Sequence, residues 1–137
     1  MIVADTGAIV ALIDRDDAHH KKFLELYKED PFEWLLPWAI LPEVDYLLSK
    51  FVGVGAEQAF VSDIANGSFR TDWGADQDLL RADELNRQYQ DLGLGLVDTI
   101  VMAIAERTRA EAIATTDERH FGAVVLVGEP RLLLRDL

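Results

Sequence analysis

Four acidic residues of this chain stand where carboxylates from four distant segments can meet. They are Asp5, Glu43, Asp98 and Asp117. Asp5 and Asp117 each end a short apolar run that is typical of a buried strand. If the two strands are parallel neighbours, their carboxylates emerge about 5 Å apart at one edge of the sheet. Carboxylates this close repel one another unless a hard divalent cation binds them. The pattern therefore predicts a metal-dependent hydrolase that acts on phosphate esters.

The segments that position these acids alternate between strand and helix patterns. Apolar runs predict strands at residues 1–5, 33–36, 68–73 and 112–116, and one or both of 124–127 and 132–134 supply a fifth. Apolar stripes at helical spacing predict helices at residues 6–13, 17–29, 38–51, 55–66, 76–92 and 97–109. Asp16 or Asp17 is expected to cap the second of these helices. Glu43 and Asp98 then lie near the starts of two helices.

Strands separated by helices indicate βαβ units, in which helices cover both faces of a parallel sheet. We therefore expect an α/β fold, a three-layer α/β/α sandwich with a parallel sheet of about five strands. The 137 residues fit one domain with a full core. In such sheets, sites form at the carboxyl ends of the strands, where Asp5 and Asp117 are expected.

Charge and composition narrow the function. The net charge of −12 argues against unaided binding to nucleic acid and favours a basic protein partner. Bound divalent cations would cancel part of this charge. The absence of cysteine excludes disulfides and thiolate metal sites. Because no apolar stretch reaches the roughly 18 residues of a membrane span and no basic leader precedes the first strand, we expect a cytoplasmic protein.

Four short motifs surround the four acids. They are Val3-Ala4-Asp5-Thr6-Gly7-Ala8, Leu41-Pro42-Glu43-Val44-Asp45-Tyr46-Leu47-Leu48, Leu96-Val97-Asp98-Thr99-Ile100-Val101-Met102-Ala103 and Ala114-Thr115-Thr116-Asp117-Glu118-Arg119-His120-Phe121. In their order and spacing, over nearly the whole length, the chain resembles the PIN-domain family and within it the ribonuclease toxins of VapC type. One departure is Gly7, where relatives often carry Ser, Asn or another small residue.

The resemblance implies a Mg²⁺- or Mn²⁺-dependent endoribonuclease, the toxin of a toxin–antitoxin module, which cleaves RNA phosphodiester bonds with metal-activated water. It implies that Asp5, Glu43, Asp98 and Asp117 are catalytic and that three of them, Asp5, Asp98 and Asp117, hold the metal. It also implies a homodimer and a cognate antitoxin. The motif selects Glu43 over Asp45, which lies about 200° further around the helix and is interpreted as a structural hydrogen-bonding residue that can reach another helix.

Several of these residues have a structural alternative. Asp5 can cap the helix that follows it, and Asp117 can be a turn residue. Thr6 and Thr116 flank the carboxylates as candidates for positioning substrate or a water molecule, with backbone hydrogen bonding as the alternative. Arg119 is a candidate for contacting phosphate or for shielding the acids.

The histidines and tryptophans are expected to be mainly structural. The three histidines do not form a ligand set, and His120 is expected to pack the loop after Asp117 together with Phe121. Trp34, Trp38 and Trp73 are expected in the core or at an interface. Trp38, near Glu43, is a candidate for stacking a base.

Three other functions compete with a toxin. The first is a PIN-domain nuclease of RNA processing. The second is a non-enzymatic, receiver-like or binding α/β module; a receiver needs a late lysine, yet Lys50 is the last one in the chain. The third is a phosphatase with a nucleophilic aspartate, which needs an acid two residues after Asp5, where Gly7 stands.

Overall fold

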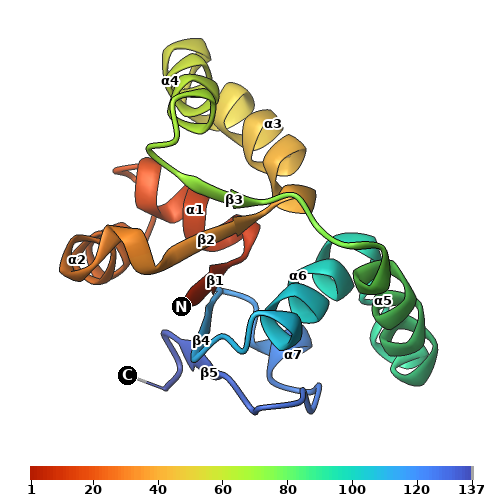
Figure 1. Ribbon diagram of the computed structural model, residues 1–137. Coiled ribbons are helices and arrows are strands. Elements are labelled where there is room, and N and C mark those ends of the chain that lie inside the picture. Colours follow the sequence, from red (N-terminus) through yellow and green to blue (C-terminus); the bar gives the residue numbers. More distant parts are fainter. Residues whose placement is uncertain (137) are drawn as a thin grey trace.

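A computed structural model describes residues 1–136 and contains one five-stranded sheet (Figure 1). The strands are β1 (Ile2–Ala4), β2 (Trp34–Pro37), β3 (Arg70–Asp72), β4 (Ala112–Ala114) and β5 (Arg131–Leu133). Their order is β3-β2-β1-β4-β5, and each neighbouring pair is parallel. The predicted parallel α/β fold is therefore confirmed. Because all five strands run the same way, their carboxyl ends meet at one edge of the sheet.

Helices flank this sheet on both faces. They are α1 (Thr6–Ile13), α2 (His20–Glu29), α3 (Leu41–Phe51), α4 (Val54–Ala65), α5 (Asp76–Gln88), α6 (Gly95–Arg107) and α7 (Glu118–Phe121). Three short 3₁₀ turns occupy Pro31–Glu33, Trp38–Ile40 and Gln90–Leu92. In Figure 1, α1 and α2 lie on one side of the sheet and α5, α6 and α7 on the other, while α3 and α4 form a pair that extends outward. Among residues 1–136, no helix combines the length and apolar character needed to cross a bilayer.

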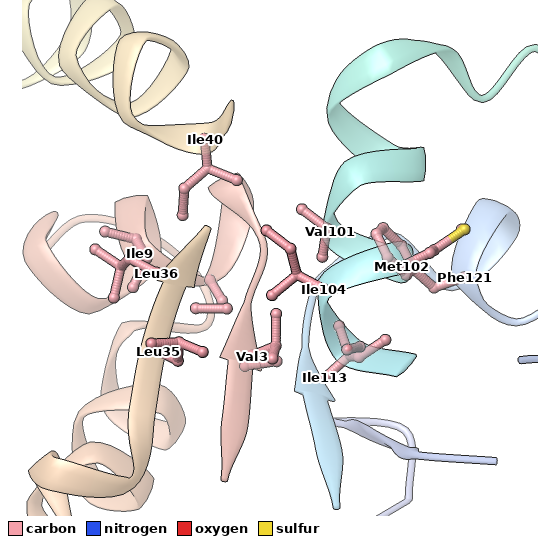
Figure 2. Close-up of a cluster of buried hydrophobic side chains, with 14 of the residues drawn as sticks. Val3, Ile9, Leu35, Leu36, Ile40, Val101, Met102, Ile104, Ile113 and Phe121 are labelled. Atoms are coloured by element: carbon pink, nitrogen blue, oxygen red, sulfur yellow. The ribbon is translucent and has the colours of Figure 1, made fainter. Parts of the chain in front are cut away.

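The central strands are apolar on both faces because helices cover both. Figure 2 shows Ile104 of α6 near Val3 and Ile113 on one side, and Ile9 of α1 near Leu36 on the other. All five side chains are fully buried. Continuous burial of this kind is typical of parallel sheets and explains why these strands read as unbroken apolar runs. The same packing aligns the carboxyl ends of the strands, and the acidic residues follow directly after these ends.

An ionic network fixes α5 and α6 relative to the sheet. The Arg107 guanidinium of α6 donates to Asp72 at the end of β3 (2.6 Å) and to Asp78 of α5 (2.8 Å). Asp78 is only 2% exposed and also accepts a hydrogen bond from the Ala75 backbone N–H, at the start of α5. Through these two acids, Arg107 ties α6 to β3 and to α5.

Some predicted boundaries differ from those of the structure, and one open alternative is decided. Helix α2 begins at His20 and not at residue 17, because the Asp17 carboxylate accepts from the His19 backbone N–H (2.8 Å) and holds a turn there. The helix predicted over 76–92 breaks at Tyr89. Segment 124–127 forms no strand, and its Val125 N–H donates instead to the Tyr89 hydroxyl (3.2 Å). The fifth strand is β5, close to the alternative predicted at 132–134.

Candidate active site

Asp5 lies at the carboxyl end of β1, in the middle of the sheet. Its backbone N–H donates to the Ala114 carbonyl of β4 (2.8 Å), so the two strand ends are aligned there. Its backbone carbonyl accepts the first hydrogen bonds of α1, but its side chain does not cap that helix. The side chain is 6% exposed. The capping alternative therefore does not account for this carboxylate.

The Thr115 hydroxyl connects the ends of β1 and β4. It donates to Asp5 Oδ2 (2.9 Å) and accepts from the Asp117 backbone N–H (2.9 Å). Burial raises the pKa of Asp5 to about 6, against the ordinary value of 3.8. Hydrogen bonds from Thr6 and Thr115 oppose this rise in pKa. The negative charges of Asp98 and Glu43 add to it, so the three acids share one site.

Glu43 reaches the site from the first turn of α3. The Thr6 hydroxyl of α1 donates to Glu43 Oε1 (2.6 Å) and so fixes the orientation of this carboxylate. Asp45 lies beside Glu57 of α4, and its side chain raises the pKa of that carboxyl. The interpretation of Asp45 as a structural hydrogen-bonding residue stays a prediction.

Asp98, Asp117 and His120 form a compact group beside Asp5. Asp98 stands in the first turn of α6, and Asp117 immediately precedes α7. His120 Nδ1 lies 2.8 Å from Asp98 Oδ2 and 3.1 Å from Asp117 Oδ2. One potential ligand atom from each of the three residues lies within 4.8 Å of the other two. Burial raises the pKa of Asp98, the hydrogen bond and charge of His120 oppose the rise, and the charges of Asp117 and Glu43 support it.

The expectation for His120 was wrong, because only Phe121 packs inward as expected. Phe121 is 3% exposed, whereas the His120 ring turns toward the carboxylates. Consecutive residues of a helix point about 100° apart, so these two side chains of α7 take different directions. Asp117 Oδ1 accepts from the His120 backbone N–H (3.0 Å), which starts that turn and also realises the predicted turn role of Asp117. The spacing could have predicted this contact, because residues three apart in a helix, such as Asp117 and His120, lie on the same face.

The polar residues next to Asp117 differ in how far they are buried. Thr115 is buried and hydrogen-bonded to Asp5, whereas Thr116 and Arg119 are exposed. Sequence reasoning missed Thr115. A Cβ on Gly7 would meet the Thr116 Oγ1 atom at less than contact distance. The Thr116 side chain therefore occupies the space that a larger residue at position 7 would need, which accounts for the departure from the family pattern.

Two tryptophans border a cavity near the same edge of the sheet. Trp38 and Trp73 follow the carboxyl ends of β2 and β3 and line a cavity of about 160 Å³. Trp73 is 70% exposed, so of the two expected places only an interface remains for it. Trp34 is 1% exposed and belongs to the core as predicted. The cavity lies at the β2–β3 side of that edge, and none of the four acids lines it.

The fold and the acidic edge together define a class of protein. Within residues 1–136, His120 is the only ion-pair partner of the four acids. A partly buried cluster of carboxylates without Lys or Arg partners is suited to a divalent cation with oxygen ligands. The molecule is therefore an α/β protein with a carboxylate-rich site at the carboxyl end of a parallel sheet.

The comparisons with known proteins agree with this class. The family model of the PIN domain matches residues 2–125, and the chain belongs to the PIN-domain family. Over 130 residues it is 28% identical to Ribonuclease VapC26 of Mycobacterium tuberculosis. The alignment covers 95% of this chain and 96% of that protein.

Solved structures share the fold. The crystal structure of VapC20, a Sarcin-Ricin loop cleaving toxin of Mycobacterium tuberculosis, superposes with a TM-score of 0.79 at 20% identity and covers 91% of this chain and 97% of that one. VapBC2 from Rickettsia felis, bound to a DNA fragment from their promoter, gives a TM-score of 0.68 at 19% identity, with 96% of this chain and 97% of that one covered.

Proposed function

We propose that this protein is a metal-dependent endoribonuclease and the toxin component of a toxin–antitoxin module. The observation that carries the proposal is the convergence of Asp5, Glu43, Asp98 and Asp117 from four elements onto one edge of a PIN-domain sheet. The relative named Ribonuclease VapC26, similar along almost the whole chain, supports cleavage of RNA. The phosphatase and receiver alternatives lack this support.

The residues present fit Mg²⁺ or Mn²⁺ as the cofactor. Asp5, Asp98 and Asp117 offer carboxylate oxygens, which both ions accept. Burial raises the pKa values of Asp5 and Asp98, so their ionised forms would gain from a bound cation, which supports the proposal. A divalent cation bound there supplies positive charge to the scissile phosphate and activates water.

The other side chains have separate roles in this mechanism. Glu43, oriented by the Thr6 hydroxyl, is exposed and accepts the proton of the attacking water. Thr115 holds Asp5 and the Asp117 backbone in register. Thr116 positions substrate or water at the rim, and exposed Arg119 contacts a substrate phosphate. The attack on phosphorus needs no basic side chain among the four acids, which reconciles an acidic protein with an acidic polymer.

Replacing Asp98 by Asn tests the proposal. The substitution keeps the shape of the side chain and removes its negative charge. We expect cleavage of an RNA substrate to fall about 100-fold or more, since loss of a metal ligand should cost more than the about 10- to 100-fold typical of residues behind the ligands. EDTA should abolish wild-type cleavage, and added Mg²⁺ or Mn²⁺ should restore it.

The matched control is Asp91→Asn, at an exposed position outside the site. It should retain full activity, and circular dichroism should show that both variants are folded. Undiminished cleavage by Asp98→Asn, or by the wild type in EDTA, would refute the mechanism.

We also propose a cognate antitoxin and a homodimer. Exposed apolar side chains on α3 and α4, among them Tyr46, Phe51 and Val61, support a protein partner on this pair of helices. The net charge of −12 favours a basic one. Co-expression with the neighbouring reading frame and co-purification test the antitoxin. Light scattering at micromolar concentration tests the dimer, and a mass of 15.4 kDa would exclude it.

Two further parts of the proposal concern the chain as a whole. We propose that residues 1–137 form a single PIN-like domain, supported by one sheet and one continuous hydrophobic cluster in residues 1–136. Limited proteolysis should therefore leave one resistant fragment of nearly full length. We propose a cytoplasmic location, where the RNA substrate lies, and cell fractionation tests it.

A further inference from the structure

The position of the His120 ring has the geometry of a metal ligand. Its Nδ1 atom lies 2.8 Å from Asp98 Oδ2 and 3.1 Å from Asp117 Oδ2. In an octahedral shell with metal–ligand bonds of about 2.1 Å, adjacent ligand atoms lie about 3.0 Å apart. The nitrogen thus already lies at the separation of an adjacent ligand from each of the two oxygens.

The surroundings of His120 keep the ring in this place. The Asp117 carboxylate fixes the His120 backbone N–H, and the buried Phe121 anchors the next residue. The side chains of His120 and Asp98 are only 21% and 16% exposed. A ring on a fixed backbone, shielded from water and directed at two carboxylates, loses little freedom when it binds an ion.

We propose that His120 binds the catalytic cation directly through Nδ1, and that this nitrogen makes the site select Mn²⁺ and related transition ions over Mg²⁺. The proposal rests on the metal-dependent function proposed above. Imidazole nitrogen is a ligand of transition metals, whereas Mg²⁺ takes oxygen ligands and gives up its waters reluctantly. In the absence of a cation, Nδ1–H donates to the carboxylates. When a cation binds, the neutral ring carries its proton on Nε2 and presents the Nδ1 lone pair.

The opposite role for the ring makes the opposite prediction. If His120 only filled the place of the cation, removing the ring would open the site, and both ions would bind more tightly. If His120 is a ligand, removing the ring weakens binding, and Mn²⁺ loses more affinity than Mg²⁺. The sign of the change in affinity therefore decides between the two.

The first measurement uses the wild-type protein with Mn²⁺. Electron spin-echo envelope modulation of the bound ion should show coupling to a directly bound nitrogen. Labelling the histidines with ¹⁵N should replace the ¹⁴N pattern. A Mn²⁺ signal without nitrogen coupling overturns the proposal, and it leaves the proposed nuclease function standing.

The second measurement is calorimetric titration of Mg²⁺ and Mn²⁺ into wild type and His120→Gln. Glutamine offers an oxygen in place of the ring nitrogen. We expect the ratio of Mn²⁺ to Mg²⁺ affinity to fall about tenfold or more, on the scale of altered metal surroundings. His19→Gln, at an exposed position before α2, is the matched control and should leave the ratio unchanged.

Each result of the titration has one meaning. Tighter binding of both ions by His120→Gln, or an unchanged ratio, overturns the role of His120 as a ligand. A wild-type protein that binds neither ion overturns the metal-dependent function and this inference together. Thermal unfolding of each variant shows whether it is folded, and the spectroscopic test on the wild type does not depend on any variant.

Discussion

Replacing Asp5 by Asn should stabilise the metal-free protein at neutral pH. Burial raises the pKa of Asp5 from the ordinary 3.8 to about 6. The folded state therefore keeps its proton in a pH range where the unfolded state has already lost it. Because the folded state binds more protons there, the free energy of unfolding falls as pH rises from about 4 to about 6. Two pKa units correspond to about 3 kcal/mol.

Asparagine removes this cost because it carries no charge at any pH. Its oxygen can still accept from Thr115, and its amide can donate toward Glu43 or Asp98. In EDTA at pH 7.5, we expect Asp5→Asn to have a free energy of unfolding up to about 3 kcal/mol higher than wild type. At pH 4 the two proteins should be nearly equal, since wild-type Asp5 is then protonated when folded.

The assay is urea denaturation in EDTA at several pH values between 4 and 7.5. Asp91→Asn is the control, and its difference from wild type should stay within about 0.5 kcal/mol at each pH. Adding Mn²⁺ at pH 7.5 should stabilise wild type by about 2.7 kcal/mol at one hundred times the dissociation constant, and Asp5→Asn by much less. Two results would show that burial of the charge is not the dominant cost. In the first, Asp5→Asn is no more stable than wild type at pH 7.5. In the second, its gain in stability over wild type is as large at pH 4 as at pH 7.5.

Other changes follow from the same contacts. Thr115→Val should lower the free energy of unfolding by about 1–3 kcal/mol, because it removes the hydroxyl that bridges the Asp5 carboxylate and the Asp117 backbone N–H. Thr115→Ser keeps a hydroxyl and should retain most of the wild-type stability; urea denaturation compares the two variants. Arg107→Gln should cost about 3–5 kcal/mol by leaving Asp78 buried without its cation, and thermal or chemical unfolding at pH 7 measures the loss. Trp73→Ala should weaken RNA binding by about 1–3 kcal/mol, because a base can stack on this exposed ring beside the cavity. Fluorescence anisotropy with a labelled RNA and the inactive Asp98→Asn background measures the binding, and unchanged affinity would show that the ring serves another surface.

The amino-acid sequence by itself determined the fold class and the edge that carries the acids. Val3 and Ile113 belong to apolar runs too short for a helix, and helical stripes separate them. Such a pattern can bury its apolar residues only in a parallel sheet covered on both sides. Once the strands are parallel, residues that follow them, such as Asp5 and Asp117, must come to one edge. Local periodicity was enough for this conclusion because each step depends on residues close together in the chain.

The tertiary structure alone decided which side chains touch at that edge. His120 reaches Asp98 across 22 residues of sequence, and Thr115 reaches Asp5 across 110. These contacts depend on side-chain direction at the end of a strand and in a single turn of helix, and hydrophobic periodicity does not specify either. The choice of residues 131–133 over 124–127 for the fifth strand had the same origin, since both runs are apolar and only backbone pairing with β4 distinguishes them. The sequence thus determined where the site lies, whereas packing between distant segments decided that a histidine stands among its carboxylates.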